Sequence, residues 1–317
     1  MRAIYQIDRL CSVELRQLEY FIAVAGEMNF SRAAQQVHVV QSALSTSVSK
    51  LEKELGVELF DRSKQQLKIT PAGELFRERA RRVIQTARLA KDSMSVYHGE
   101  LTGTIDIGSL ISFGKLDVPR VLGEFHRKYP FVRIKLRQSQ TGSTAYLSAI
   151  ADGSLDLALV SAPDRFPAGV EMQRLSEEPM VFVCRPDHRL AHRGHVAISE
   201  LADEELIGFP KEFGLRRLVD DAFAAAGATA HTPYEVALEY SLAGRLVKHG
   251  LGTIFMPVSE ATRFPELRAV DVRPAVVWTI YLASAETTRL APASARLAEL
   301  LLALADSTSA PGTEPPS

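Results

Sequence analysis

Apolar residues follow a helical period from residue 14 to residue 97. The first predicted helix is apolar at positions i, i+3, i+6, i+7 and i+10, which are Leu15, Leu18, Phe21, Ile22 and Ala25. Gly26 is expected to end it. A second, shorter helix begins near Asn29 or Ser31, either of which can act as its N-cap, and it buries Ala33 and Ala34.

The third predicted helix has two faces of different character. Its buried stripe at i, i+4, i+7 and i+11 is Leu44, Val48, Leu51 and Leu55. The opposite face is short, polar and free of acidic residues, and consists of Ser42, Ser45, Thr46, Ser49 and Lys53. Such a face suits a helix that enters the DNA major groove, because it donates and accepts hydrogen bonds without repelling phosphate. Spacing alone equally fits an all-α subdomain with a serine-rich surface helix.

A basic turn and a long helix follow. Val57, Leu59 and Phe60 are expected to be buried, and the acid-free stretch from Arg62 to Thr70 predicts a wing that contacts phosphates through Arg62, Lys64 and Lys68. Pro71 suits the first position of a helix that continues to about Tyr97. A helix of this length needs a partner, so we expect dimerisation through its apolar positions, which include Leu75, Phe76, Val83, Ile84 and Ala87.

From Thr104 on, short β-branched runs alternate with helical segments, which predicts an α/β region with parallel sheets. Two lobes are expected, and the chain is expected to cross between them near Ala162 and Val270. Polar residues follow the predicted strands or begin the helices at positions where open α/β sheets bind ligands. These candidate effector contacts are Ser109, Ile111, Ser112, Thr141, Ser143, Ser161, Phe209 and Arg216.

Composition narrows the class of protein. The 317 residues carry 37 Lys and Arg against 38 Asp and Glu, which excludes a histone-like protein. Residues 14–70 hold seven basic and seven acidic residues, so charge alone does not indicate nucleic-acid binding there. No apolar run is long enough for a secretory signal or a membrane span, and two cysteines make no disulfide framework, so a cytoplasmic protein is expected. Residues 307–317 are rich in Pro, Ser and Thr and are expected to be disordered.

The sequence gives little support for a catalytic site or a metal site. His188, His192 and His195 have helical spacing, but Pro186 and Gly194 favour a solvated loop over a metal site. The sequence contains no nucleophile elbow, dinucleotide fingerprint or phosphate-binding loop, so neither enzyme activity nor a cofactor is expected. Two alternatives stay open on the residues alone: a solute-binding protein with an unrelated helical N-terminus, and an enzyme with an α/β catalytic domain.

Three segments resemble the N-terminal domain of the LysR-type transcriptional regulators: ELRQLEYFIAVAGEMNFSRAAQQ, QSALSTSVSKLEKELGVELFDR and LKITPAGELF. The pieces FPELRAV, GLRRLVDDAFAAAG and VKHGLGTIFMP extend the resemblance to about residue 305. It implies a winged helix–turn–helix at 14–70 with the helix–turn–helix at 30–49, a linker helix at 71–97, and an effector-binding domain at 104–305. That domain resembles periplasmic solute-binding proteins, with lobe I at about 104–162 and 270–305 and lobe II at about 163–269. Residues 1–13 are either a native extension or the product of a start codon assigned too early.

The resemblance also implies which residues contact DNA. Gln41 and Ser45 are expected to contact bases, and the DNA backbone is expected to be contacted by Ser31, Arg32, Lys50, Arg62 and Thr70. The chain departs from the family pattern at Val40-Gln41-Ser42 and at Thr46-Ser47, so site preference does not carry over there.

The function implied is that of a transcriptional regulator. A homodimer or a tetramer built from two dimers binds paired half-sites of double-stranded DNA. A small-molecule effector binds between the lobes and switches the protein. Helix N-termini favour anions, so an organic anion is the expected effector.

Overall fold

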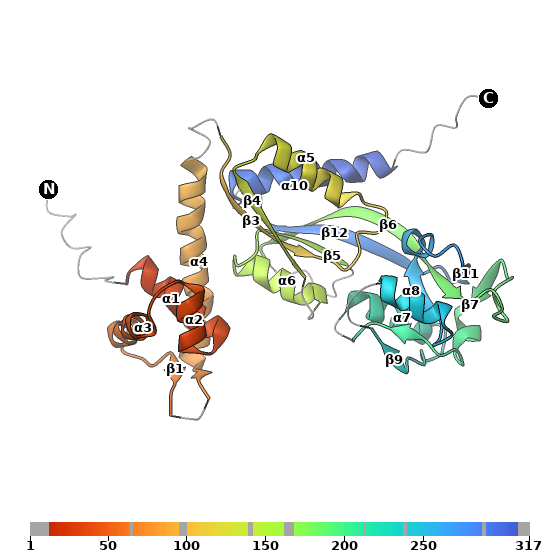
Figure 1. The fold of residues 1–317 in the computed structure, drawn as a ribbon, viewed down its shortest axis with the longest axis horizontal. Coiled ribbons are helices and arrows are strands. Elements are labelled where there is room, and N and C mark those ends of the chain that lie inside the picture. Colours follow the sequence, from red (N-terminus) through yellow and green to blue (C-terminus); the bar gives the residue numbers. More distant parts are fainter. Residues whose placement is uncertain are drawn as a thin grey trace. The chain divides into compact units, whose positions relative to one another are not determined.

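The computed structural model describes residues 13–63, 66–94, 100–138, 142–161, 168–211, 213–236, 240–286 and 290–309. The chain divides into two compact units (Figure 1). The first runs to Lys91 and includes Asp152–Ser154, and the second comprises the remainder from Asp92. Each unit is described by itself.

The first unit is helical. Its helices are α1 (Leu15–Glu27), α2 (Phe30–Gln36), α3 (Gln41–Leu55) and α4 (Pro71–Ser93), and a hairpin of β1 (Phe60–Asp61) and β2 (Lys68–Ile69) forms the wing. As predicted, Asn29 caps α2, since its Oδ1 accepts hydrogen bonds from the N–H groups of Ser31 and Arg32. Gly56 takes the left-handed conformation that ends α3, with φ of 68°.

Two details of the helical prediction are wrong. Helix α1 continues past Gly26, and Met28 adopts the left-handed conformation at its end. Val57 is 43% exposed because it follows the turn after α3 and points away from the core. Helix α4 is described as far as Ser93, and residues 95–97 of the predicted helix lie outside the described residues.

An aromatic core joins the helices of the first unit. Phe21 is fully buried, with its ring centroid 5.4 Å from that of Phe60 and 5.2 Å from that of Phe76. Leu44, Val48 and Leu51 of α3 complete this core, so their predicted burial is confirmed, while Leu55 is half-buried. The polar face of α3 is therefore directed away from the core.

The second unit is built on an eight-stranded mixed sheet. Its path runs β4 (Val132–Gln138), β3 (Gly103–Ser109), β5 (Leu157–Ser161), β12 (Val277–Ala285), β6 (Val170–Cys184), β11 (Arg268–Arg273) and β7 (His195–Ala197), and β10 (Ile254–Pro257) pairs with β6. The remaining strands, β8 (Ile207–Gly208) and β9 (Tyr234–Glu235), pair with each other. The expected parallel sheet is found for β3, β4 and β5, but β12 runs antiparallel to both of its neighbours.

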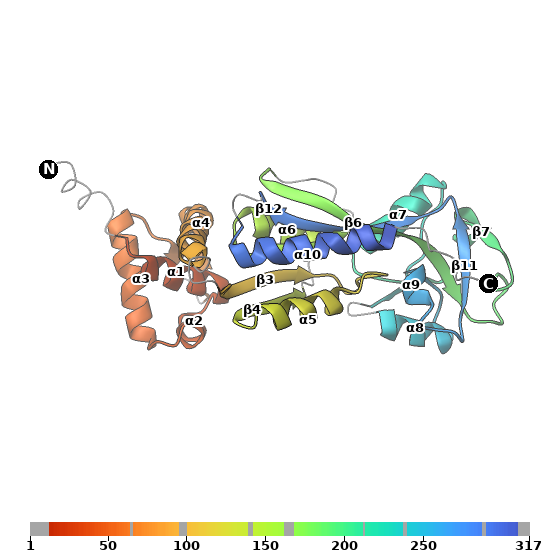
Figure 2. The same cartoon turned by 90° about the horizontal axis from the view of Figure 1, so that it is seen from above.

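Strands β6 and β12 decide where one lobe ends and the other begins (Figure 2). Residues of β6 up to Pro179 pair with β12, and from Met180 on they pair with β10 and β11. The first crossing therefore lies inside β6, which corrects the predicted crossing near Ala162. The second crossing lies between β11 and β12, after Val270, because Val270 still pairs with Phe182 in lobe II. We define lobe I as the part before Met180 together with β12 and the residues after β12, and lobe II as the part between the crossings.

Helices cover both faces of the lobe I sheet. Helices α5 (Val118–Lys128) and α10 (Pro292–Ser309) lie side by side over one face, and α6 (Gly142–Ala151) lies on the other (Figure 1). Residues Leu157 and Leu159 of β5 belong to the core under α5 and α10, whereas Ala158 and Val160 belong to the core under α6. This alternation follows from the two-residue period of a strand.

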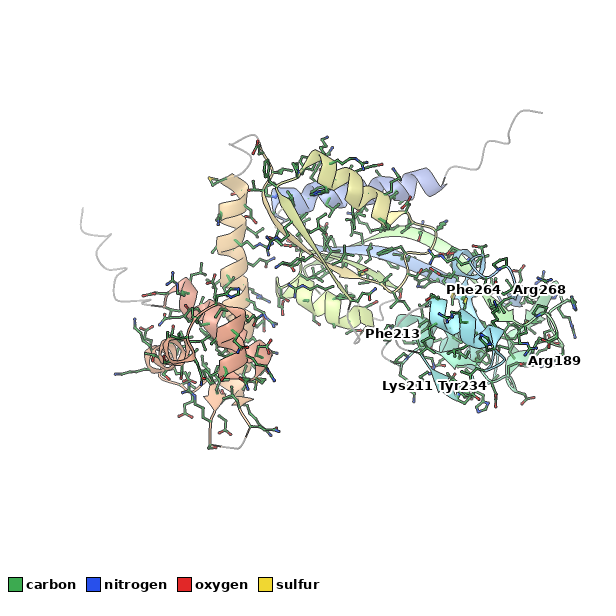
Figure 3. All side chains as sticks on the ribbon, viewed as in Figure 1. Arg189, Lys211, Phe213, Tyr234, Phe264 and Arg268 are labelled. Carbon is green, nitrogen blue, oxygen red and sulfur yellow. The ribbon has the colours of Figure 1, made fainter. Side chains whose placement is uncertain are left out.

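Lobe II carries the 3₁₀ helix η3 (Ile198–Leu201) and the helices α7 (Gly214–Ala225), α8 (Tyr240–Lys248) and α9 (Val258–Ala261). Phe213 lies on the side of lobe II that faces lobe I, and Arg189 lies on the far side (Figure 3). Within the described ranges, none of the helices combines the length and the apolar character that crossing a bilayer requires.

Candidate nucleic-acid interface and ligand cleft

Helix α3 presents the polar face that its sequence predicts. The side chains of Ser42, Thr46, Ser49 and Lys53 are exposed, and Ser45 is half-buried beside them. No side chain caps the start of α3, since Val40 occupies the N-cap position. Instead Ser31 Oγ donates a hydrogen bond to Gln41 Oε1 over 2.8 Å, which links α2 to the first turn of α3. The two helices therefore form one surface.

Arg62 links the wing to α3. Its Nη2 lies 2.8 Å from Glu52 Oε2, its Nη1 donates to Ser49 Oγ, and its guanidinium lies 5.0 Å from the centroid of the Phe30 ring. Glu52 in turn accepts hydrogen bonds at Oε1 from the N–H groups of Leu59 and Phe60. Glu52 thus orients Arg62, a role that sequence reasoning missed because helical spacing does not reveal contacts with the wing.

The other residues predicted to contact the DNA backbone differ in whether their side chains already have partners in the chain. Arg32 pairs with Glu27 and Lys50 with Glu54, while the side chain of Lys68 is exposed. Lys64 lies outside the described residues. Thr70 Oγ1 donates to the Glu58 carbonyl and accepts from the N–H of Gly73, as an N-cap of α4 does. Thr70 therefore has a structural role, and its phosphate contact stays a prediction.

Helix α4 divides its apolar residues between two environments. Phe76 packs on Phe21, and Ile84 packs against the same core. Leu75 and Val83 remain 61% and 51% exposed, and Ala87 is half-buried. Two of the five predicted dimerisation residues, Leu75 and Val83, are therefore apolar and exposed on this helix.

A cleft opens where lobe I meets lobe II. The described residues that line it carry no charged side chain, and they are Ser109, Leu110, Ile111, Gly142, Ser143, Tyr146, Ser161, Phe213, Gly214, Leu215 and Trp278. Phe213, Gly214 and Leu215 belong to lobe II, and the other lining residues belong to lobe I. The cavity volume of the cleft is about 20 Å³, which is room for about one water molecule.

Two glycines bring the walls of the cleft together. A Cβ on Gly108 would lie 2.6 Å from Cδ1 of Tyr146, so only glycine lets that ring pack on β3. The Tyr146 hydroxyl lies 2.9 Å from the carbonyl oxygens of both Ser109 and Arg137. A Cβ on Gly214 would lie 2.9 Å from the carbonyl oxygen of Ser161, so glycine also permits α7 to approach lobe I.

Four predicted effector contacts line the cleft, namely Ser109, Ile111, Ser143 and Ser161. The hydroxyl of Ser143 accepts a hydrogen bond from the N–H of Ser161 over 3.1 Å, which joins the start of α6 to the end of β5. These residues come from three segments that the strand–helix pattern placed at strand ends or helix starts. Thr141 lies outside the described residues.

The other predicted contacts do not line the cleft. Ser112 Oγ donates to the buried Glu260 carboxylate and accepts from the N–H of Gly114. Phe209 and Arg216 border a separate cavity within lobe II, and Arg216 Nε lies 2.9 Å from Asp220 Oδ2. Ser112, Phe209 and Arg216 therefore lie outside the lining of this cleft, partners in the folded chain engage the two polar groups, and their effector contacts stay predictions.

Sequence reasoning missed the aromatic lining. Trp278 is 1% exposed and faces the cleft from β12, and Phe213 faces it from the residue before α7. Trp278 has no motif around it, and it lies in a largely apolar strand. The useful signal is composition: Trp278 is the single tryptophan of the chain.

The histidine-rich segment is a turn, as expected. His188 Nε2 lies 3.0 Å from Glu204 Oε2, and His195 begins β7. Among the residues that the structure describes, no group of three or more His, Cys, Asp or Glu side chains is arranged to hold a metal ion.

Comparison with known proteins is consistent with a DNA-binding surface on the first unit and a ligand cleft in the second. Residues 98–306 match the LysR substrate binding domain, and residues 15–74 match the bacterial regulatory helix-turn-helix protein family of lysR type. A hydrogen peroxide-inducible genes activator of Pectobacterium carotovorum is 31% identical over 83% of this chain and 85% of its own length. The transcriptional regulator ShiR of Corynebacterium glutamicum is 30% identical over 84% of this chain and 92% of its own. Full-length OxyR of Pseudomonas aeruginosa has the same fold, with a TM-score of 0.71, 24% identity, and coverage of 93% of this chain and 95% of that one.

Proposed function

The chain belongs to the LysR family of bacterial transcriptional regulators, and we propose that it binds paired DNA half-sites through α3 and the wing and is switched by a small molecule between its lobes. It is a DNA-binding regulator with an effector-binding domain, and the families it matches are regulators and not enzymes. The observation that carries the proposal is the acid-free polar face of α3, held against the wing by Arg62. Because its ligand is DNA, we infer that the protein acts in the cytoplasm.

The effector site is proposed to be the interlobe cleft, and its ligand an organic anion. The first turns of α6 and α7 both line the cleft, and no described side chain caps α7. Helix N-termini present free N–H groups and a positive end of the helix dipole to an anion. A ligand that binds the separated lobes better than the closed ones, or the reverse, would shift the balance between the two arrangements.

Reaction of a cysteine with peroxide receives no support from the described residues. One relative carries a name that links it to hydrogen peroxide, and such chemistry needs an accessible thiolate. Cys184 is fully buried, and burial raises the pKa of its thiol to about 11. Cys11 lies outside the described residues. We therefore propose that the effector binds without a covalent step at Cys184.

We propose that the protein forms a homodimer through α4 and, from two dimers, a tetramer. A Val83→Glu substitution should raise the dissociation constant of the α4-mediated dimer by roughly 100-fold, because each chain would bring a charge into an apolar contact at a cost of several kcal/mol. Sedimentation velocity over a range of concentrations measures this change. Thr102 is exposed in the second unit, so Thr102→Glu carries the same charge as a control. Unchanged association of the Val83 variant would contradict the assignment of α4.

The proposed function is tested by fluorescence anisotropy of the full-length protein on its own upstream DNA. The measurement is made at about 150 mM salt with scrambled competitor DNA, because non-specific binding depends strongly on salt. We expect binding that the competitor does not remove. Binding no tighter than to scrambled DNA would contradict a sequence-specific regulator of this promoter.

A further inference from the structure

Two buried glutamates lie where the chain crosses between the lobes. Glu178 precedes the first crossing in β6 and belongs to lobe I, while Glu260 lies in α9 of lobe II. Both residues are 4% exposed. A buried carboxylate is costly unless hydrogen bonds or opposite charges replace the water that it has lost. The partners of these two carboxylates therefore decide how firmly the crossing is held.

Glu178 joins three segments through backbone N–H groups. Its Oε2 accepts a hydrogen bond from Ser259 of lobe II over 3.0 Å, and its Oε1 accepts one from Lys115 of lobe I over 3.3 Å. The loop that carries Lys115 can approach this closely because residue 114 is glycine, where a Cβ would collide with Glu178 Oε1. One carboxylate thus holds β6, this loop and the start of α9 together.

Glu260 makes a contact in the opposite direction. The Ser112 hydroxyl of lobe I donates a hydrogen bond to Glu260 Oε1, and the same hydroxyl oxygen accepts one from the N–H of Gly114. Glu260 Oε2 lies 3.3 Å from Nη1 of Arg263, whose side chain is 70% exposed. Each lobe therefore contributes one buried carboxylate that accepts a hydrogen bond from the other lobe.

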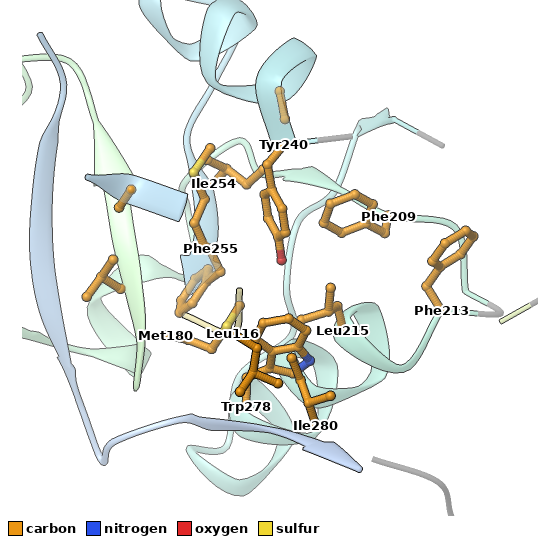
Figure 4. Packing of buried hydrophobic residues seen from close by; sticks show 14 of the residues in the cluster. Leu116, Met180, Phe209, Phe213, Leu215, Tyr240, Ile254, Phe255, Trp278 and Ile280 are labelled. Atoms are coloured by element: carbon orange, nitrogen blue, oxygen red, sulfur yellow. The ribbon is translucent and has the colours of Figure 1, made fainter. Parts of the chain in front are cut away.

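These contacts adjoin the cleft without belonging to its described lining. Trp278, which does line the cleft, pairs with Glu178 across the sheet, and a Cβ on Gly114 would lie 2.9 Å from Cζ3 of its indole. The indole lies beside the side chain of Leu215 of lobe II, which lines the same cleft (Figure 4). The contacts at the crossing are thus connected to the wall of the cleft through one residue.

In the proposed switch, a ligand acts on the balance between two arrangements of the lobes. We propose that the hydrogen bonds of Glu178 with Ser259 and of Glu260 with Ser112 form an interlobe lock, whose strength sets how much of the protein has separated lobes when no ligand is bound. Hydrogen bonds to a charged group are strong, and removing one partner leaves a carboxylate buried and unpaired. Substitutions in the lock should therefore change this balance while α3 and the described lining of the cleft stay intact.

Acrylamide quenching of tryptophan fluorescence tests the interlobe lock in the full-length protein. Trp278 is the single tryptophan, is 1% exposed and lines the cleft, so the quencher reaches it when the lobes separate. Ser112→Ala removes the hydrogen bond to Glu260, and Glu178→Gln replaces one acceptor oxygen with an amide group that cannot accept from a backbone N–H. We expect each substitution to raise the Stern–Volmer quenching constant by at least about threefold, because the separated arrangement becomes more populated.

Two further variants provide the reference and the matched control. Gly214→Ala is the reference for separated lobes, since its Cβ would lie 2.9 Å from the carbonyl oxygen of Ser161 across the cleft. Glu177→Gln is the control, because Glu177 precedes Glu178 in β6 but has a side chain that is 45% exposed and pairs with Arg174. Quenching in the two lock variants should approach that of the reference, and the control should behave as the wild type.

Tyr240→Phe distinguishes the interlobe lock from the general loss of a buried hydroxyl. The Tyr240 hydroxyl has no hydrogen-bond partner within the described part of the chain. Burial, followed by the charges of Glu260 and Glu178, raises the pKa of Tyr240 well above its usual range, so it is a neutral neighbour of the lock. Because its removal breaks no described hydrogen bond, quenching should stay within about twofold of the wild type.

Three results would overturn the inference. The first is an unchanged quenching constant in Ser112→Ala and Glu178→Gln, and the others are an equal rise in Glu177→Gln or in Tyr240→Phe. Circular dichroism checks the fold, and Ser112→Ala, which removes only a hydroxyl, carries the test if the Glu178 variant does not fold. Anisotropy of the wild type on its upstream DNA separates this failure from that of the proposed function. Specific DNA binding together with unchanged quenching in the lock variants removes the lock alone.

Discussion

Replacing Ser45 with glutamate is expected to weaken specific DNA binding by more than about 100-fold, with the fold unchanged. Ser45 lies half-buried on the polar face of α3, next to the exposed Ser42 and Ser49. A carboxylate there would face DNA phosphates and base acceptors, and such a contact between like charges costs several kcal/mol. Anisotropy with promoter DNA measures the loss, and circular dichroism checks the fold.

The position of the charge provides the control for this prediction. Thr102→Glu adds the same charge at an exposed position of the second unit and should leave DNA affinity within about twofold. Because α3 lies outside the second unit, Ser45→Glu should also bind acids as the wild type does. Specific DNA binding retained by the Ser45 variant would show that another surface reads the operator.

A Phe21→Ala substitution should destabilise the first unit by about 3–5 kcal/mol, the range for truncating a buried aromatic residue. Phe21 is fully buried, and its ring contacts those of Phe60 at the base of the wing and Phe76 on α4. One cavity would therefore loosen α1, the wing and α4 together. Because the total stability of a domain is about 5–15 kcal/mol, we expect DNA binding to be lost at lower urea concentration or at 37 °C.

The two units can be followed separately in this experiment. Helical circular dichroism reports on the whole chain, while the fluorescence of Trp278 reports on the second unit alone. The Trp278 transition in urea should stay near that of the wild type. Phe131→Ala removes a phenyl ring that is 61% exposed and should change stability by less than about 0.5 kcal/mol. A Phe21 variant as stable as the wild type would refute the proposed role of this aromatic core.

The local pattern of the chain was sufficient for the helical unit. The apolar stripe of α3 and the Asn29 cap depend on residues at most 11 positions apart, and a helix brings such residues onto one face. The wing could also be predicted from a local pattern, because short apolar segments bound its basic turn. The exceptions in this unit are the end of α1 and the exposure of Val57, both of which lie where the chain leaves a helix.

The strands of the second unit were harder to predict from the sequence, because β6 belongs to both lobes. The first half of β6 alternates irregularly between buried and exposed residues and includes Arg174, Glu177 and Glu178, so it lacks the period that marks a strand. The crossing was therefore placed before β6 and not within it. Short strands such as β7 and β9 carry too few residues for any period to appear.

Sequence by itself determined the polar face of α3, the helices of the first unit, and the serines that end β3 and β5 or begin α6, because each of these is a local property of the chain. Tertiary structure alone decided which side chains share a surface. It directed Ser112 to Glu260, away from the cleft, and it brought Gly214 against Ser161. The physical reason is that most of these contacts join residues far apart in sequence, whose meeting depends on how β6 and β12 pass between the lobes.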